Sequence, residues 1–266
     1  MKFTAESSTN RDATTNLKLA FMDEQLIFYI DFVGFAEAIR SWDEEKMAAL
    51  IELLSDLALI RGEFDFSEEA EDGGKRFNIR PAISTFSDHI VISYPTEYLR
   101  KMGGGDSLVN GLVFAQKLVS QLAAAAMRLG LLIRGGATVG PLYHSGGVVL
   151  GAAMVEAYHL ESRVSIYPRI AVSRKLYSQV KINPRDLFLL EDDDGITHFN
   201  YFPSMILRSR ETGEPITTWL ANARRIIAEN IENFERKEYW NELAKWVWFR
   251  NKLEQARLSL PDALFQ

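Results

Sequence analysis

Residues 26–33 (LIFYIDFV) form an apolar run, rich in β-branched and aromatic side chains, that is interrupted by a single aspartate, Asp31. The run predicts a buried strand. A carboxylate inside such a strand raises the free energy of the fold unless something pairs with it. The chain must therefore fold so that a suitable partner reaches Asp31.

The patterns after this strand alternate between helical and strand-like spacing. They predict a helix at 35–60 that can break at 41–45, strands at 77–86 and 89–94, an Ala-rich helix at 108–129, and a hairpin at 131–150 with strands near 131–139 and 142–149. The order strand, helix, strand, strand, helix, strand is that of a split βαβ, ferredoxin-like unit. We therefore predict an α+β fold with a sheet rich in antiparallel pairs.

The rest of the chain adds elements to this unit. We expect a helix at 152–163, a strand at 168–173, a short helix at 174–180, strands within 186–201, and helices over 215–258. Trp240, Leu243 and Val247 have the spacing of an apolar helical stripe. Asp192 to Asp194, followed by Gly195, predict a solvated turn.

Composition excludes several classes of site. The net charge of −6 gives no overall attraction to nucleic acid. The chain has no cysteine, which excludes disulfides and thiolate metal sites, and its four histidines lack zinc-ligand spacing. The N-terminus is polar and no apolar run has the roughly 18–20 residues of a membrane span. We therefore expect a cytoplasmic protein with no membrane span.

The end of the first strand combines two features that suit a phosphate ligand. Gly34 follows the strand and lets backbone N–H groups approach a ligand, and Phe35 opens a helix whose N-terminus favours an anion. Asp31 to Phe35, including Phe32 and Val33, thus place a metal ligand beside a phosphate cradle. Taken alone, a strand aspartate is more often structural.

Asp88 lies in the turn between the second and third strands, where an aspartate is ordinarily a turn residue. In a split βαβ sheet the first and third strands lie side by side, so Asp31 and Asp88 should come close together. Two carboxylates with triphosphate oxygens suit Mg²⁺ or Mn²⁺. In chemistry of this kind one ion activates the attacking oxygen and the other holds the phosphates.

Three segments, in this order, resemble the motifs of class III nucleotide cyclases: residues 28–35 (FYIDFVGF), 85–94 (TFSDHIVISY) and 134–151 (RGGATVGPLYHSGGVVLG). The resemblance covers roughly residues 26–173. It implies that Asp31 and Asp88 bind two Mn²⁺ or Mg²⁺ ions, with the carbonyl of Phe32 as a further ligand. It also implies a palm-type cyclase core, a head-to-tail homodimer, and attack of the ribose 3′-OH on the α-phosphate.

Departures from the family pattern point to the substrate. Ser84 stands where purine cyclases carry Lys or Glu, and Val148 where they carry Asp. The helical Asn and Arg are replaced by Val155 and His159, or by Glu156 and Leu160 one residue later.

Residues 151–170, together with Phe-Ser-Asp at 86–88, resemble bacterial pyrimidine cyclases of antiphage signalling. This second resemblance implies UTP first and CTP second as substrate, and an effector reached through the cyclic nucleotide.

With a cyclase core in the middle, the chain divides into three expected parts, and several residues are candidates for contacts with the substrate. We expect a flexible lead-in at 1–24, a catalytic domain at 25–205, and a C-terminal helical extension at 206–266 packed on the same domain. Candidate phosphate cations are Arg134, preferred, then Arg163 and Arg169, with His159 as a weaker one. Taken alone, each residue of these types is more often structural or on the surface. Tyr29, Phe86 and Tyr158 can stack on the base or be core aromatics.

Two other functions remain open. A cyclase-like binding or regulatory module without catalysis fits the missing Asn and Arg. Another palm-type nucleotidyl transferase fits the predicted sheet, although the Gly-rich hairpin and the acidic net charge make it less attractive.

Overall fold

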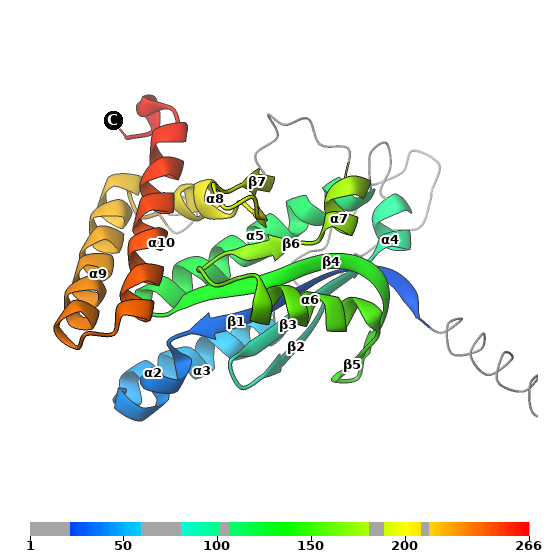
Figure 1. The fold of residues 1–266 in the computed structure, drawn as a ribbon, viewed down its shortest axis with the longest axis horizontal. Coiled ribbons are helices and arrows are strands. Elements are labelled where there is room, and N and C mark those ends of the chain that lie inside the picture. The colour runs from blue at the N-terminus through cyan, green and yellow to red at the C-terminus, as the bar shows by residue number, and fades with distance from the viewer. Residues whose placement is uncertain (1–21, 60–80, 102–106, 181–188, 209–212, 266) are drawn as a thin grey trace, which may run out of the picture.

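The chain forms a mixed sheet with helices on both faces, as the computed structural model shows (Figure 1). The structure describes residues 22–59, 81–101, 107–180, 189–208 and 213–265. The central strands are β1 (Asp23–Val33), β2 (Ala82–Phe86), β3 (His89–Pro95) and β4 (Leu132–Ser145), in the spatial order β2-β3-β1-β4. Every neighbouring pair among these four is antiparallel, so the predicted ferredoxin-like α+β fold is confirmed.

The alternating side chains of β1 divide between two cores. Leu26, Phe28 and Ile30 pack in the large core, which includes α5 (Ser107–Arg128). Ile27 and Tyr29 pack in a smaller core on the opposite face, against α6 (Ala152–Arg163). Asp31 continues the second series, so its carboxylate lies on the α6 face of the sheet.

The helix predicted at 35–60 is two helices, α2 (Phe35–Ser41) and α3 (Glu44–Leu59). The Oδ1 atom of Asp43 accepts a hydrogen bond from the backbone N–H of Lys46 at 3.0 Å, so Asp43 is the cap. The hydroxyl of Ser41 instead donates to the carbonyl of Glu37. The acidic segment 61–76 and the glycine-rich segment 102–106 lie outside the described residues, as does the start of the strand predicted at 77–86.

The hairpin predicted at 131–150 has its turn in a different place. β4 runs through the expected turn at Gly140 and Pro141, and the chain reverses at Gly146 and Gly147 before β5 (Val148–Leu150). Pro141 pairs with β1, while β6 pairs with β4 only over Gly135–Ala137 and β5 only beyond Leu142. A proline is tolerated there because no strand lies on its other side.

The sheet continues beyond β4. The added strands and short helices are β6 (Ile170–Val172), α7 (Arg174–Gln179), β7 (Leu189–Glu191), β8 (Thr197–Phe199), α4 (Thr96–Lys101) and α8 (Phe202–Leu207). β6 runs parallel to β4, and β8 runs antiparallel to β6. The sequence patterns predicted the helix at 152–163, β6 and α7, but not α4 or α8.

The C-terminal segment forms two helices, α9 (Ile216–Arg236) and α10 (Trp240–Ser259), that contribute to the large core. The predicted stripe on α10 is wrong, because Trp240 is 60% exposed. The buried stripe is Trp246, Phe249 and Leu253, which has the same i, i+3, i+7 spacing in another register. The periodicity predicts the helix but not the face that is buried, because large apolar residues occur in both possible stripes.

One described helix, α5, has the length and mean hydropathy of a membrane span by composition alone. Of its apolar window, 61% is buried within the molecule, which is the pattern of a core helix. The composition of 108–129 predicts an Ala-rich helix, which α5 is.

Candidate active site

Asp31 lies near the end of β1, opposite His89 on β3 and Arg134 on β4 in the strand register. Only 6% of the residue is exposed. The two neighbouring strands therefore supply the partners that the sequence required for a carboxylate in this run. Burial raises the pKa of Asp31 above its ordinary value, although the hydrogen bond and charge of Arg134 lower it in part.

Asp88 reaches Asp31 from the tight turn between β2 and β3, where Ser87 adopts a positive φ of 56°. The backbone N–H of Phe32 donates to the carbonyl of Asp88 at 3.2 Å, which fixes the turn beside β1. The prediction that the split βαβ frame brings both aspartates together is thus met in the structure.

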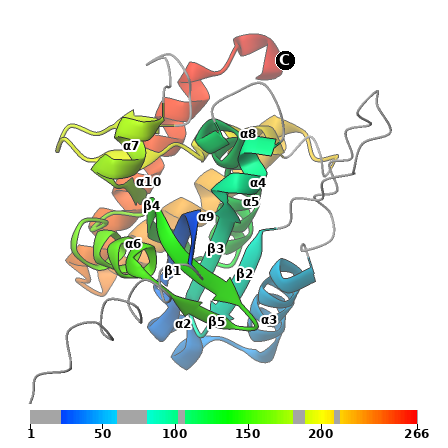
Figure 2. The same ribbon diagram turned by 90° about the vertical axis from the view of Figure 1, so that its right-hand side faces the viewer.

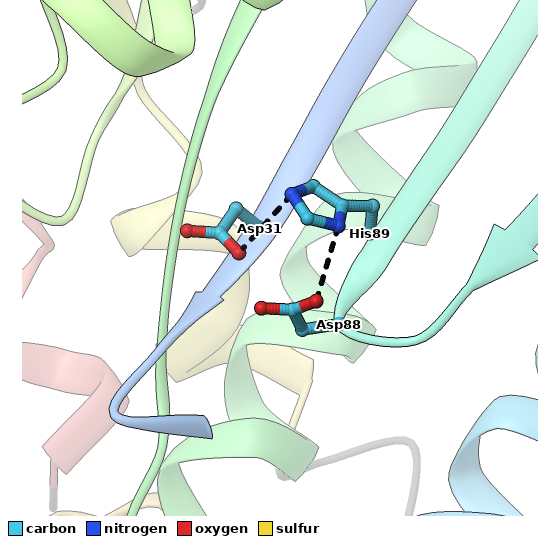
Figure 3. A group of neighbouring side chains, drawn as sticks. All are labelled: Asp31, Asp88 and His89. Atoms are coloured by element: carbon cyan, nitrogen blue, oxygen red, sulfur yellow. Dashed lines mark ion pairs between the residues drawn. The ribbon is translucent and has the colours of Figure 1, made fainter. Parts of the chain in front are cut away.

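His89 lies between the two aspartates, as Figure 3 shows. Its Nδ1 atom is 3.1 Å from Oδ1 of Asp88, and its Nε2 atom is 3.8 Å from Oδ1 of Asp31. One potential ligand atom from each of the three residues lies within 4.8 Å of the other two. Two carboxylates and an imidazole at this separation can hold a divalent cation.

Arg134 links Asp31 to a second buried acid on α6. Its Nε atom donates to Oδ2 of Asp31 at 2.8 Å, and its Nη2 atom forms an ion pair with Oε1 of Glu161 at 2.8 Å. Glu161 is only 3% exposed, and burial raises its pKa despite the nearby Arg134. Arg134 therefore orients Asp31, and its single positive charge is shared between two carboxylates.

The aspartates open onto a cavity of about 490 Å³. Its lining residues come from β1, α2, the β2–β3 turn, β4 and the C-terminal helices: Asp31, Phe32, Val33, Gly34, Phe35, Ala36, Glu37, Arg40, Asp88, Arg134, Phe234, Tyr239, Glu242 and Lys245. The volume lies within the usual range of small-molecule sites, roughly 300–1,000 Å³. The predicted cradle residues Val33, Gly34 and Phe35 thus border the same space as the aspartates, and α2 has no side-chain cap.

Aromatic rings form one wall beside the aspartates. The ring of Tyr29 lies 5.2 Å from that of His89 and 5.8 Å, edge-on, from that of Tyr158. Burial, followed by the charge of Glu161, raises the pKa of Tyr29. Phe86 is 82% exposed at the β2–β3 turn. Tyr29 is thus mostly a core aromatic, whereas Tyr158 and Phe86 present free surface.

Ser84 belongs to a polar chain across the same face of the sheet. Its hydroxyl lies 2.9 Å from Nε2 of His144, whose Nδ1 atom lies 2.8 Å from the hydroxyl of Ser93. Ser93 donates to the side-chain oxygen of Gln25 at 2.6 Å, and Gln25 donates to the carbonyl of Leu142 at 3.0 Å. The curled end of β4 therefore lies over β2 and β3, and Ser84 has a fixed environment.

Arg169 lies away from this group. Its guanidinium is 1% exposed and donates to Asp192 at 2.7 Å and to Asp194 at 2.6 Å. The prediction of a solvated run at 192–194 is therefore wrong for Asp192, which is 8% exposed and also pairs with Lys252 of α10. The turn itself is present, with Gly195 at a φ of 73°. A buried arginine and a half-buried lysine from distant segments offset the burial of this carboxylate.

The two registers left open for the helical Asn and Arg differ in exposure: Glu156 and Leu160 are half-buried on α6, whereas the other pair lies on its surface. Val155 is 55% exposed, and His159 and Arg163 are also exposed. These side chains line a shallow hollow of about 570 Å³ on α6 with Ala152, Glu156, Leu160 and Val164. The carboxylate of Glu156 accepts a hydrogen bond from Thr138 at 3.0 Å.

Sequence reasoning missed four residues of this region: His89, Glu161, Arg40 and Lys245. The neighbour of Asp88 in sequence, His89, was a usable signal, because a histidine next to a metal aspartate is a potential ligand. Glu161 has i+4 helical spacing from Ala157, which faces the sheet, but its partner Arg134 lies on β4, and no local pattern reveals that contact. Lys245 comes from the C-terminal helices, whose docking no local pattern reveals.

Comparison with known proteins gives a fold likeness and nothing closer. No protein-family model matches the chain, and no curated protein matches it. The catalytic core of a rhodopsin-guanylyl cyclase with converted specificity, in complex with ATPαS, is 17% identical with a TM-score of 0.41, over 67% of this chain and 94% of that one. A bacterial light-regulated adenylyl cyclase is 14% identical with a TM-score of 0.40, over 76% and 98% of the two chains. Likenesses of this extent establish neither a family nor an activity, so function is inferred below from the residues of the site.

Proposed function

We propose that this protein is a metal-dependent nucleotide cyclase that converts a pyrimidine nucleoside triphosphate to its 3′,5′-cyclic monophosphate and pyrophosphate. The observation that carries the proposal is the convergence of Asp31 and Asp88, from two segments of the sheet, at the edge of a cavity of about 490 Å³. In this reaction the 3′ oxygen of the ribose bonds to the α-phosphorus. The bond from that phosphorus to the bridging oxygen breaks, and the 3′-OH proton is released.

The donor set fits a pair of divalent cations. Asp31 and Asp88 would supply carboxylate oxygens and Phe32 its carbonyl, the hard ligands that Mg²⁺ and Mn²⁺ accept. Bound ions would activate the 3′-OH and neutralise charge on the phosphates. Asp31 is buried and its pKa is raised, so a bound cation would offset the cost of its buried negative charge.

Arg134 is the candidate for the cation that stabilises charge developing on the α-phosphate. It contacts Asp31 directly and lines the cavity. Its position at Glu161 shows that it also orients the site, so the two roles need separate tests. Gly34 and Phe35 line the cavity from the β1–α2 connection, and their backbone N–H groups would donate to phosphate oxygens.

The proposed base is a pyrimidine, with UTP preferred and CTP second. Support comes from Ser84, where purine cyclases carry a long charged residue in the pattern described above. The hydroxyl of Ser84 is small and is held by His144, so it can contact a uracil edge without filling the space of the base. Two aromatic residues lie on this face near Ser84 in the strand register: Tyr29, which is largely buried, and Phe86, which is exposed.

A head-to-tail homodimer is part of the proposal. Exposed apolar side chains gather on α6, β5 and the β2–β3 turn: Phe86, Val148, Leu150, Val155 and Tyr158. α6 and the β4–β5 hairpin cover the same face of the sheet (Figure 2), and a second copy would bury these residues. The cyclic product would act as a second messenger on a separate effector, in antiphage defence.

A second function is favoured by one observation. Neither register of α6, Val155 with His159 or Glu156 with Leu160, carries the Asn and Arg of the family pattern. Arg134 is already shared by two acids. A cyclase-like module that binds nucleotide without turnover would have these properties. It would bind triphosphate with metal and release no pyrophosphate.

Variants of the two aspartates test the mechanism. Pyrophosphate release from UTP with Mn²⁺ should fall at least about a thousandfold in Asp31→Asn and in Asp88→Asn, because each removes a charged ligand. Asp193→Asn, at an exposed position of the β7–β8 turn, is the matched control and should keep the wild-type rate. Unchanged rates in either aspartate variant, with folding verified by circular dichroism, would refute the proposed metal site.

A further inference from the structure

The first turns of α10 border the cavity that contains the two aspartates. Glu242 and Lys245 line it from α10, and Tyr239 lines it from the residue before the helix. Arg40 lines it from α2, an element far away in sequence. The C-terminal helices are therefore part of the wall of the site and not only a support for the core.

The helical spacing fixes the direction in which Lys245 points. Trp246, Phe249 and Leu253 face the large core, while Glu242 and Lys245 share an adjacent face through i, i+3 spacing. Farther along α10, Lys252 pairs with Asp192, and the ring of Trp248 stacks on Tyr167 at 5.7 Å. These contacts hold α10 against the sheet, so Lys245 has a defined place at the cavity.

Acidic side chains outnumber basic ones around the cavity, so a bound triphosphate requires cationic side chains that are not already paired. Four carboxylates and three cationic side chains line it: Asp31, Glu37, Asp88 and Glu242 against Arg40, Arg134 and Lys245. Arg134 is taken up by Asp31 and Glu161. Lys245 pairs with Glu242 only at 3.6 Å, longer than a hydrogen bond, and Arg40 is exposed.

We propose that Lys245 of α10, together with Arg40 of α2, binds the β- and γ-phosphates of a nucleoside triphosphate whose α-phosphate lies at Asp31 and Asp88. The proposal rests on the proposed function for the class of ligand. A lysine ammonium on a flexible stem has three donors and suits phosphate oxygens. The C-terminal helices thereby supply substrate contacts, and their docking sets the affinity for the triphosphate tail.

Binding of inorganic tripolyphosphate tests this without any turnover. With Mn²⁺ present, Lys245→Gln should raise the Kd for tripolyphosphate about tenfold in calorimetric titration, because a charge-assisted hydrogen bond is lost. Lys245→Arg should restore most of the affinity. Arg250→Gln, an exposed change on the same helix, is the matched control and should shift the Kd less than twofold.

Two further measurements separate the outcomes. Binding of Mn²⁺ alone, followed by electron paramagnetic resonance, should be the same in wild type and Lys245→Gln, because both aspartates remain. Equal tripolyphosphate affinity in these two proteins, or no binding by wild type, would overturn the role of Lys245. Wild type that binds tripolyphosphate through Lys245 but forms no cyclic nucleotide would refute the proposed catalysis and leave this binding site standing.

Discussion

Gly136 marks the closest approach between the sheet and α6, and replacing it by alanine should destabilise the fold. A Cβ atom there would lie 2.2 Å from the carbonyl oxygen of Ala157 and 2.6 Å from the Cβ of Leu160. These are atoms of the helix backbone and the root of a side chain, which cannot swing aside. α6 would have to move away from β4 as a body.

The expected loss is at the upper end of the range for overpacking, about 3 kcal/mol. For a chain of this size each kilocalorie lowers Tm by roughly 2–4 °C, so Tm should fall by roughly 6–12 °C. Thermal and urea unfolding followed by circular dichroism measure both quantities. Since α6 carries Glu161 and Tyr158, nucleotide turnover should fall as well.

Gly140→Ala is the matched control, four residues along β4 on the same face. Its Cβ would meet the Nζ atom of Lys175 at 3.1 Å and the Cβ of Ala153 at 3.5 Å. The end of a lysine side chain can move, and alanine restricts the unfolded chain, so stability should change by less than about 0.5 kcal/mol. Equal destabilisation by the two substitutions would contradict the packing of α6 on β4 at Gly136.

Two more predictions concern the candidate metal ligands and the buried ion pairs. His89→Ala should weaken binding of Mn²⁺ and Co²⁺ about tenfold and leave Mg²⁺ binding nearly unchanged, because imidazole favours transition metals. Equal losses of affinity for all three ions, measured by calorimetry, would exclude His89 as a ligand. Burial alone would raise the pKa of Asp192, but contacts with His198, Lys252 and Arg169 lower it below its ordinary value. Its stabilisation is therefore complete above the unfolded pKa, about 3.9, and is lost as pH falls through the lower folded value. Asp192→Asn should cost about 3 kcal/mol at pH 7 and flatten the loss of stability below pH of about 4, whereas parallel pH profiles in denaturant titrations would show that Asp192 does not contribute.

The sequence predicted the elements whose signals are local. The apolar run around Asp31, the break before α3 and the helix at Ala152–Arg163 all follow from composition and spacing over a few residues. The proximity of Asp31 and Asp88 also followed, because the element order of a split βαβ unit determines which strands are neighbours.

What the sequence left undetermined depends on distant contacts. The sequence pattern predicts a turn at Pro141. The residue is instead accommodated in β4, because no strand pairs with it on the side away from β1. The sequence pattern predicts a solvated Asp192. Its burial is possible because it pairs with Arg169, the residue before β6, and with Lys252 of α10. No local pattern could have revealed these partners, and the same holds for Lys245 at the cavity.

The most direct test of the central claim is to identify the product formed from each triphosphate. The wild-type protein should be incubated with Mn²⁺ and UTP, CTP, ATP or GTP, and the products separated by chromatography and identified by mass spectrometry. We predict 3′,5′-cyclic UMP as the main product, less cyclic CMP, and pyrophosphate in equal amount, with none of these from Asp31→Asn. Binding of the triphosphates without any cyclic mononucleotide, or products of extension or transfer, would contradict the proposed cyclase.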